Sequence, residues 1–371
     1  MKIGIDARLL ERKITGIGRS LILLLENFPL YDKSNEYFLF SYDKLNLNDK
    51  FYTNITTIKP FIPQKIFSPI WSNLILPYYL RKYKIDLLFS VNQVVPLIKV
   101  KNCKYISVVH DVIFKADKKF LPFIYRKYLQ LFAFFSLKVS DVIITVSEYS
   151  KSDIIKHYRI NPNKIKVVLQ SANKKFTALN LTDEEKLKIK SQLGLTEKVV
   201  LFVGMIENRK NIATILKVAD MFNNLRDKVT FVLVGKIGYG GKDYLKRIQN
   251  SNNVKHLINI DDELLNKLYN ISDVFLFPSY YEGFGYPPLE AMQCGLPVIV
   301  SSNTSLKEIV ADGGILCQPE DHKKIYDEIS KLLDDKDYWL KYSRAGINRA
   351  QNFNLEKSVK EILSIFNSLN N

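Results

Sequence analysis

Cysteine and histidine are scarce in this chain of 371 residues, which contains three cysteines and four histidines. Cys103, Cys294 and Cys317 lack the spacing of a zinc site or of a disulfide framework. We therefore expect three small buried side chains in a reducing compartment. Asp335 and Asp337 form a D-x-D pair, but they lie in a charged helical pattern, which favours a solvated helix face over a metal site.

Long apolar runs are also missing. No uninterrupted apolar run approaches the roughly 18 residues that a membrane-spanning helix needs. The first ten residues, MKIGIDARLL, carry one lysine followed by an aspartate, and this is not the pattern of a signal peptide. No Ser/His/Asp arrangement or Walker phosphate loop can be read in the chain. These absences predict a cytoplasmic protein.

Positive charge is abundant, and it is unevenly placed. The formal net charge is +16 in a chain that is 47% hydrophobic, a composition typical of a folded globular protein. Residues 1–180 contain 29 basic and 13 acidic side chains, whereas residues 181–371 contain 25 of each. The first half should therefore be drawn to an anionic partner, such as nucleic acid, an acidic lipid surface or a phosphorylated substrate.

Short apolar runs recur along the chain with helical patterns between them. The runs that read as buried strands are KIGID (2–6), YFLFS (37–41), DLLFS (86–90), YISVVHD (105–111), DVIITVS (141–147), KIKVVLQ (164–170), VVLFVG (199–204), VTFVLVG (229–235), KHLINI (255–260), DVFLFPS (273–279) and PVIVS (297–301). Alternation of strand and helix predicts parallel sheets covered on both faces. The fold class is therefore α/β.

The strand pattern breaks once, at residues 171–198, where a polar stretch and a helix pattern after Thr182 indicate a linker. We predict two tandem Rossmann-like, doubly wound domains that face each other across a cleft, over residues 1–175 and 176–350. Residues 351–371 read as an amphipathic terminal helix, for which packing back on the first domain is one arrangement. In such sheets ligands bind beyond the carboxyl ends of the strands.

The stretch EGFGYPPLE (282–290) follows the predicted strand 273–279. Gly283 and Gly285 remove side chains and let backbone N–H groups approach a ligand. Two prolines suit the first turn of a helix, and helix N-termini favour anions and hydroxyl-rich ligands. Glu282 and Glu290 would then bracket one ligand, and ionised carboxylates suit sugar or ribose hydroxyls. The alternative is a plain strand–turn–helix joint with a helix-capping acid.

Two further turns carry candidate phosphate-binding groups. In VGMIENRKN (203–211), Arg209 and Lys210 precede a predicted helix, which would suit a diphosphate; the alternative is a solvated basic turn. In TGIGRS (15–20), Gly16 and Gly18 open a helix. Leu21 stands where the dinucleotide fingerprint requires its third glycine, so an ordinary tight loop is the simpler reading on its own.

A histidine and an aspartate stand at the carboxyl end of the predicted strand 105–111. His110 and Asp111 occupy the place where functional residues gather in this architecture. A lone histidine is usually structural, and His157, His256 and His322 have no comparable setting. Because His110 lies where the interdomain cleft is expected, a functional role is more plausible for it than for the other histidines.

These segments in this order resemble the retaining glycosyltransferases of family 4, which have the GT-B fold. DARLL…TGIGRS, VVHDVIF, TVSEYSKSDIIKHY, ENRKN and EGFGYPPLEAMQCGLPVI look like that family's blocks, and the two glutamates match its E-x7-E motif. The resemblance covers nearly the whole chain and is greatest to bacterial mannosyltransferase-like members that build surface polysaccharides. The first domain would then be the acceptor and membrane side, and the second would bind the nucleotide sugar.

The resemblance implies roles for individual positions. Glu282 would contact the donor sugar near the reacting centre, and amides around Phe284 and Gly285 would hold that sugar. Glu290 would bind the ribose hydroxyls, while Arg209 and Lys210 would neutralise the diphosphate. In the first domain, Gly16 and Gly18 would leave room for the diphosphate and acceptor, and His110 would contact the donor sugar with Asp111 and Ser147 nearby.

One position departs from the family's pattern. Many relatives carry Arg directly after the glycine matching Gly204, but Met205 stands here. Arg209 and Lys210 must then supply the diphosphate charge.

The implied activity is transfer of a hexose, with mannose from GDP-mannose as best candidate, to a lipid-linked or polysaccharide acceptor in glycan synthesis. The nucleotide sugar would be the donor substrate, with no cofactor and no metal. An epimerase or glycogen-synthase-like enzyme of the same fold, and a basic nucleic-acid-binding protein, are the alternatives; a sugar-diphosphate constellation in the neutral half argues against nucleic acid.

The basic excess would be explained by a membrane surface. Residues 115–138 mix Lys and Arg with many aromatic side chains and have no acid after Asp117. We expect this segment to lie on the anionic inner face of the cell membrane as a peripheral anchor. The alternative is a core helix with a basic solvent-facing side.

Overall fold

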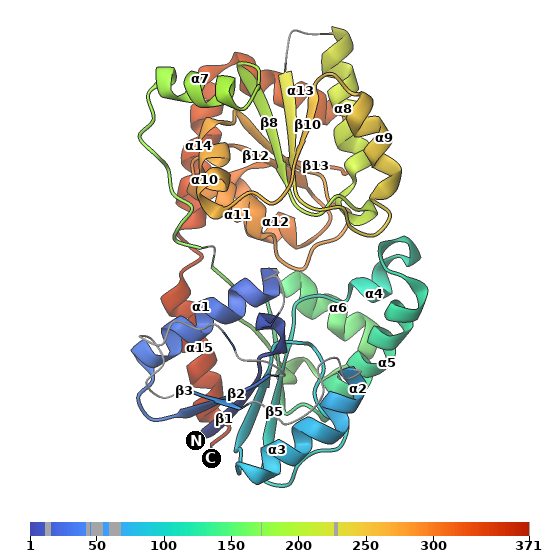
Figure 1. Cartoon of the computed structure of the whole chain (residues 1–371), viewed down its shortest axis with the longest axis vertical. Helices are drawn as coiled ribbons and strands as arrows, with labels where there is room; N and C mark the ends of the chain where they lie inside the picture. Colours follow the sequence, from blue (N-terminus) through green and yellow to red (C-terminus); the bar gives the residue numbers. More distant parts are fainter. Residues whose placement is uncertain are drawn as a thin grey trace. The chain divides into compact units, whose positions relative to one another are not determined.

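The computed structural model describes residues 1–11, 16–41, 45, 55–58, 68–171, 173–225 and 229–370. The chain forms two compact units. The first consists of Met1–Val112, Ile124–Ser171 and Asn354–Asn371, and the second of Ile113–Phe123 and Ala172–Phe353. Figure 1 shows the elements of each unit.

The first unit is built on a parallel sheet of seven strands in the order β3-β2-β1-β4-β5-β6-β7. The strands are β1 (Lys2–Asp6), β2 (Glu36–Phe40), β3 (Ile55–Ile58), β4 (Leu87–Ser90), β5 (Lys104–Val109), β6 (Val142–Thr145) and β7 (Ile165–Val167). Its helices are α1 (Gly16–Tyr31), α2 (Ser68–Ile70), which continues through a π-helical turn (Trp71–Ile75) into α3 (Leu76–Lys82), α5 (Phe123–Val139), α6 (Glu148–Tyr158) and α15 (Leu355–Ser368).

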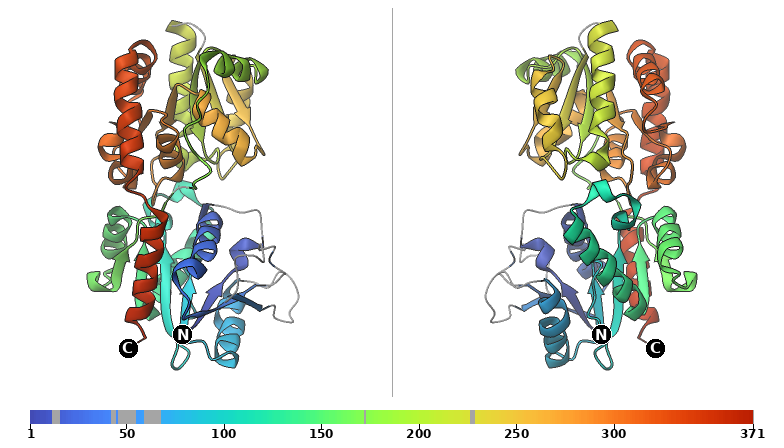
Figure 2. Two further views of the ribbon diagram at one scale, coloured as in Figure 1. Left: turned by 90° about the vertical axis from the view of Figure 1, so that its left-hand side faces the viewer. Right: turned by 90° about the vertical axis from the view of Figure 1, so that its right-hand side faces the viewer.

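Both faces of this sheet are buried, as the near-continuous apolar strands require. Successive side chains point to opposite faces. Tyr37 and Leu39 of β2 therefore pack into a core with α1 and α15, whereas Phe38 and Phe40 pack into a second core with α3. Figure 2 shows α15 running beside α1 on one face of the sheet.

The second unit has a parallel sheet of six strands in the order β10-β9-β8-β11-β12-β13. The strands are β8 (Lys198–Val203), β9 (Val229–Val234), β10 (Val254–Leu257), β11 (Val274–Phe277), β12 (Val298–Ser301) and β13 (Ile315–Cys317). The helices are α4 (Ile113–Ala116), α7 (Asp183–Gln192), α8 (Ile212–Leu225), α9 (Lys242–Asn250), α10 (Asp262–Ile271), α11 (Tyr286–Gln293), α12 (Ser305–Val310), α13 (His322–Asp334) and α14 (Lys336–Ala350), with short 3-10 helices η4 (Lys118–Phe120) and η6 (Asn208–Lys210).

The units differ from the predicted domain ranges in two places. The division falls after Ser171 instead of after residue 175, and residues 113–123, which we expected in the first domain, group with the second unit. The reason for the second difference is local packing. The ring of Phe120 stacks on Tyr280 at a centroid distance of 6.3 Å and an interplanar angle of 19°.

The linker and the terminal helix form from strong local signals. Thr182 and Glu185 make a reciprocal capping box at the start of α7, where we predicted a helix after Thr182. The side chain of Asn354 caps α15 by accepting from the amides of Glu356 and Lys357. Residues 351–371 were predicted as a terminal helix, with packing back on the first domain as one arrangement; in the structure α15 belongs to the first unit.

We predict that Phe366→Ala destabilises the first unit by about 3–5 kcal/mol, because it leaves a cavity in a packed core. Phe366 is fully buried, and its ring lies 5.8 Å from that of Phe28 and 5.2 Å from that of Phe89. Urea unfolding monitored by Trp71, in a background where Trp339 of the second unit is changed to Phe, measures the loss. Asn367→Ala, an exposed neighbour, is the control; equal effects of the two changes would contradict the prediction.

Candidate functional site

A strand–turn–helix joint in the second unit carries the two predicted glutamates. Strand β11 ends at Phe277, and α11 begins at Tyr286 with proline in its first positions, as predicted. Gly285 precedes the helix with φ of +132°, and a Cβ atom there would lie 2.6 Å from a methyl carbon of Leu306. A side chain at this positive φ would be strained and would clash with Leu306, so the observed turn between Glu282 and α11 requires glycine here.

A buried serine holds that turn from outside the motif. The hydroxyl of Ser305, at the start of α12, donates to the carbonyl oxygens of Glu282 at 2.8 Å and Phe284 at 2.9 Å. Both carbonyls are thereby directed toward α12. Sequence reasoning missed Ser305; the signal was a run of small hydroxyl residues just beyond the predicted strand 297–301.

Four charged side chains form one connected cluster beside this turn. Lys210 Nζ lies 2.6 Å from Glu282 Oε1, and Arg209 Nη1 lies 2.8 Å from Glu282 Oε2. Arg209 also donates through Nε and Nη2 to Glu207 Oε1, at 3.0 and 2.7 Å. The cluster contains two acids and two bases, so its formal charges cancel. Glu207, at the carboxyl end of the β8 region, was not among the predicted residues.

The cluster is largely buried, and its pKa values follow from burial and pairing. Burial raises the pKa of Glu282, but the charges of Arg209 and Lys210 and the hydrogen bond from Lys210 outweigh it, so the pKa lies below its ordinary value. Burial and the neighbouring Arg209 lower the pKa of Lys210. Glu282 is therefore an ionised carboxylate held by two cations.

The basic pair was predicted as a diphosphate seat at a helix N-terminus. Arg209 and Lys210 lie in the 3-10 helix η6, and Asn211, with φ of +55°, turns the chain into α8. The ammonium group of Lys210 lies 4.5 Å from the centroid of the Phe277 ring. Both cations are paired with carboxylates, so the chain's own acids compensate the two charges that were predicted to hold a diphosphate.

Glu290 lies in a second, separate polar contact. It is buried on α11, and the hydroxyl of Tyr269 from α10 donates to its Oε2 at 2.8 Å. Tyr269 was not predicted as part of the site. A carboxylate accepts several hydrogen bonds, so this bond from Tyr269 leaves acceptor capacity on Glu290.

The remaining predicted residues belong to the first unit. His110 follows β5 and is buried, which lowers its pKa to about 4 and keeps the imidazole neutral near pH 7. Its carbonyl accepts a hydrogen bond from Ser150 Oγ at 2.9 Å. The carbonyl of Asp111 accepts from Gln93 Nε2 at 3.4 Å. These contacts fix the backbone beyond the carboxyl end of β5.

Ser147 and the two glycines have local structural explanations. Ser147 is the N-cap of α6, and its side chain accepts a hydrogen bond from the amide of Ser150. Gly16 is the first residue of α1 and is exposed, whereas Gly18, two residues further on, is buried. Among the predicted residues, hydrogen bonds and ion pairs join Arg209, Lys210 and Glu282 directly.

In the described part of the chain, no three His, Cys, Asp or Glu side chains lie close enough together to form a possible metal site. Within the same ranges, no helix has the length and apolar character needed to cross a bilayer.

Family models match two parts of the chain: "Glycosyl transferases group 1" over residues 183–353 and "Glycosyltransferase Family 4" over residues 33–170. The chain therefore contains a family 4 glycosyltransferase domain and a group 1 glycosyltransferase domain. Among its relatives, O-antigen chain mannosyltransferase B of Escherichia coli is 28% identical over 269 residues, or 71% of this chain and 70% of the relative. An uncharacterised glycosyltransferase of Methanocaldococcus jannaschii is 30% identical, over 60% of this chain and 61% of the relative.

Solved structures show the same fold for this glycosyltransferase. Sucrose-phosphate synthase from Thermosynechococcus elongatus matches with a TM-score of 0.76 at 20% identity, covering 100% of this chain and 99% of that chain. WaaG, a glycosyltransferase of lipopolysaccharide biosynthesis, matches with a TM-score of 0.74 at 15% identity, over 98% and 99%. The predicted GT-B fold is confirmed.

We predict that Glu282→Gln destabilises the second unit by about 3–5 kcal/mol near pH 7, because it leaves buried cations underpaired. A carboxyl group whose folded pKa lies below 4.5 stabilises the fold above that pH, and the stabilisation is lost as the pH falls through the lowered value. The difference in unfolding free energy between the wild type and the variant should therefore shrink below about pH 4.5.

Urea titrations at pH 3.5 to 7, monitored by Trp339, measure this difference. Glu263→Gln is the matched control, because Glu263 is an exposed acid paired with Lys267 on one helix face. A constant difference at all pH values would show that folding does not lower the pKa of Glu282.

Proposed function

We propose that this enzyme transfers a hexose, with retention of anomeric configuration, from a nucleotide-sugar donor to a lipid-linked or polysaccharide acceptor. The observation that carries the proposal is the ion cluster of Glu282, Arg209 and Lys210 at the EGFG turn of a family 4 chain. Mannose from GDP-mannose is the first donor to test, because O-antigen chain mannosyltransferase B is among the relatives.

The cluster suggests how a diphosphate is received and neutralised. The oxygens of the diphosphate would replace the Glu282 carboxylate as partners of Arg209 and Lys210. The positive charges of both side chains would therefore stay neutralised before and after the donor binds. Breaking the sugar–phosphate bond adds negative charge to the leaving diphosphate, and preorganised cations stabilise that charge. We therefore propose that Arg209 and Lys210 fill the role that a metal ion fills in other transferases.

The same exchange would give Glu282 its function. Released from the cations, its carboxylate would accept hydrogen bonds from donor-sugar hydroxyls near the reacting carbon, where oxocarbenium character develops. The turn held by Ser305 limits how far Glu282 can move, because both neighbouring carbonyls are anchored. Glu290, already bonded to Tyr269, would accept from the ribose hydroxyls.

Transfer requires an acceptor, whereas epimerisation does not. Incubating the enzyme with GDP-mannose alone and analysing the sugar therefore separates the proposed transferase from an epimerase of the same fold. An altered sugar in the absence of acceptor would replace the proposed function.

We predict that Glu290→Ala raises the Kd for GDP about 10- to 100-fold, because a carboxylate's hydrogen bonds are lost. Glu282→Ala frees Arg209 and Lys210 for the diphosphate, so the Kd for GDP should stay equal or fall, whereas kcat should fall by about 100-fold or more. Calorimetric titration with GDP and initial rates with GDP-mannose measure the two effects. Glu263→Ala, an exposed acid of the same unit, is the control. Unchanged binding and turnover in both variants would remove the site assignment.

A membrane-facing role for the first unit is a second part of the proposal. On α5, exposed apolar side chains Ile124, Leu131 and Phe135 lie on one helical stripe with exposed Lys127 and Lys138. The exposed fractions are 81% for Ile124, 54% for Leu131 and 40% for Phe135. Apolar insertion combined with lysine attraction is typical of binding to an anionic bilayer surface.

A second stripe of the same kind runs along α2 and α3. Ile70, Leu74 and Tyr78 are exposed at successive four-residue intervals, and Arg81 follows on the same side. These helices and α5 belong to the same unit. Two such stripes support a peripheral location at the inner face of the cell membrane, where a lipid-linked acceptor is found.

We predict that Lys127→Glu with Lys138→Glu weakens binding to anionic vesicles at least about 30-fold, because each lysine near the surface contributes about 1 kcal/mol. Co-sedimentation with vesicles containing phosphatidylglycerol, compared with neutral phosphatidylcholine vesicles, measures the loss. Lys188→Glu with Lys341→Glu changes the charge equally at exposed positions of the second unit. Equal wild-type binding to both vesicle types would contradict the membrane role.

A further inference from the structure

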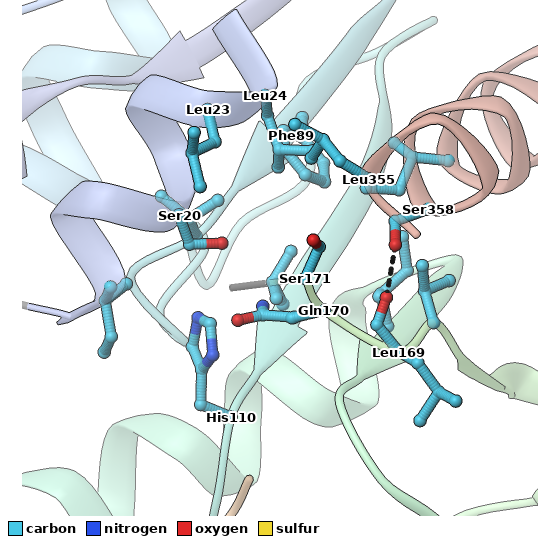
Figure 3. A pocket seen from close by; sticks show the side chains of 16 residues that line it. Ser20, Leu23, Leu24, Phe89, His110, Leu169, Gln170, Ser171, Leu355 and Ser358 are labelled. Carbon is cyan, nitrogen blue, oxygen red and sulfur yellow. Dashed lines mark hydrogen bonds between the residues drawn. The ribbon is translucent and has the colours of Figure 1, made fainter. Parts of the chain in front are cut away.

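A small cavity lies inside the first unit beyond the carboxyl ends of β5 and β7. Its volume is about 30 Å³, which is room for one water-sized group. Most of its wall is apolar, with contributions from α1, β4, β5, β6 and α15, among them Leu24, Phe89 and Ile362. Figure 3 shows Ser20, His110 and Gln170 around this space.

Two polar atoms in the cavity wall are buried without a hydrogen-bond partner among the described residues. They are Nε2 of His110 and Oε1 of Gln170. The hydroxyl of Ser358, also in the wall, donates instead to the carbonyl oxygens of Leu169 and Asn354. A buried polar atom without a partner costs free energy, so two of them facing one cavity indicate a place for a ligand group.

The chemistry of these atoms selects that group. A glutamine Oε1 atom accepts hydrogen bonds and does not donate, so its partner must carry a proton. The neutral imidazole of His110 can donate or accept at Nε2, depending on the tautomer. A single hydroxyl group satisfies both atoms by donating to Gln170 and accepting from His110. An anion would meet the carbonyl dipole of Gln170, and a cation would be buried among apolar side chains.

We propose that Gln170, together with His110, binds one hydroxyl group of a carbohydrate substrate and thereby sets which sugars the enzyme accepts. This inference rests on the proposed glycosyl transfer. The hydroxyl belongs either to the donor sugar or to the acceptor, and the same chemistry serves both. Gln170 is a specificity-determining residue in this role, because only a sugar with a hydroxyl at the matching position can donate to its Oε1.

The test combines Gln170→Leu with substrates that lack single hydroxyl groups. One arm uses GDP-mannose and its monodeoxymannose analogues, and the other uses octyl α-mannoside and its monodeoxy analogues as acceptors. For the wild type, removal of the recognised hydroxyl should raise KM about tenfold in one arm only, because one hydrogen-bond pair is lost. For Gln170→Leu, the KM for the parent sugar should already be about tenfold higher than that of the wild type. Its KM for the deoxy sugar should be the same as its KM for the parent sugar.

The thermal stability of Gln170→Leu distinguishes a substrate-binding role of Gln170 from a purely structural one. Because Oε1 has no partner in the unliganded protein, Gln170→Leu should keep or raise the Tm. Gln192→Leu, the same change at an exposed position of the second unit, is the control. A lowered Tm with a uniform loss of kcat, or discrimination in the variant equal to that of the wild type in both arms, would overturn the proposal.

A thermal-shift titration with the same sugars tests the hydroxyl site without turnover. A wild type that transfers no sugar would end the proposed function. If its Tm still rises with a parent sugar but not with one deoxy analogue, and Gln170→Leu abolishes that difference, the hydroxyl site is supported. If no deoxy sugar behaves differently from its parent, the hydroxyl site is wrong.

Discussion

The ion cluster around Glu282 is the constraint on which the second unit's chemistry depends. A buried carboxylate is costly unless it is paired, and here Lys210 and Arg209 pair it at 2.6 and 2.8 Å. The pairing joins the turn after β8 to the turn after β11, which are neighbouring strands in the sheet. Under the proposed function, a diphosphate that binds these cations would take over bonds that Glu282 makes now, so its binding would be coupled to a rearrangement of Glu282.

Much of the fold could be predicted from the sequence because local signals agree with the tertiary structure. Eleven apolar runs were predicted as strands, and each contains or overlaps an observed strand. The glycine and proline spacing of residues 282–297 was informative because φ values near +132° and +74° admit little else. Strands β3 and β13 were missed, because ITTI is half exposed and ILC has three residues, too short to read as a pattern.

The site was harder to predict, because its contacts join residues far apart in sequence. Arg209 and Glu282 are separated by 73 positions, so the pattern could indicate each residue but not that they neutralise each other. Ser305 and Tyr269 act on Glu282 and Glu290 from other elements, and small hydroxyl or aromatic residues carry no signal of such a role. Gln170 shows the same limit: only the folded wall of the cavity reveals that its oxygen lacks a partner.

The late position of α15 in the sequence has a consequence for folding during synthesis. The helix supplies Val359, Ile362, Leu363 and Phe366 to the core of a unit whose strands are all encoded before residue 168. During translation, β1 to β7 leave the ribosome long before their covering helix exists, while the second unit can close as soon as it emerges. The half that is made first is therefore completed last, and its apolar surface must be shielded in the interval.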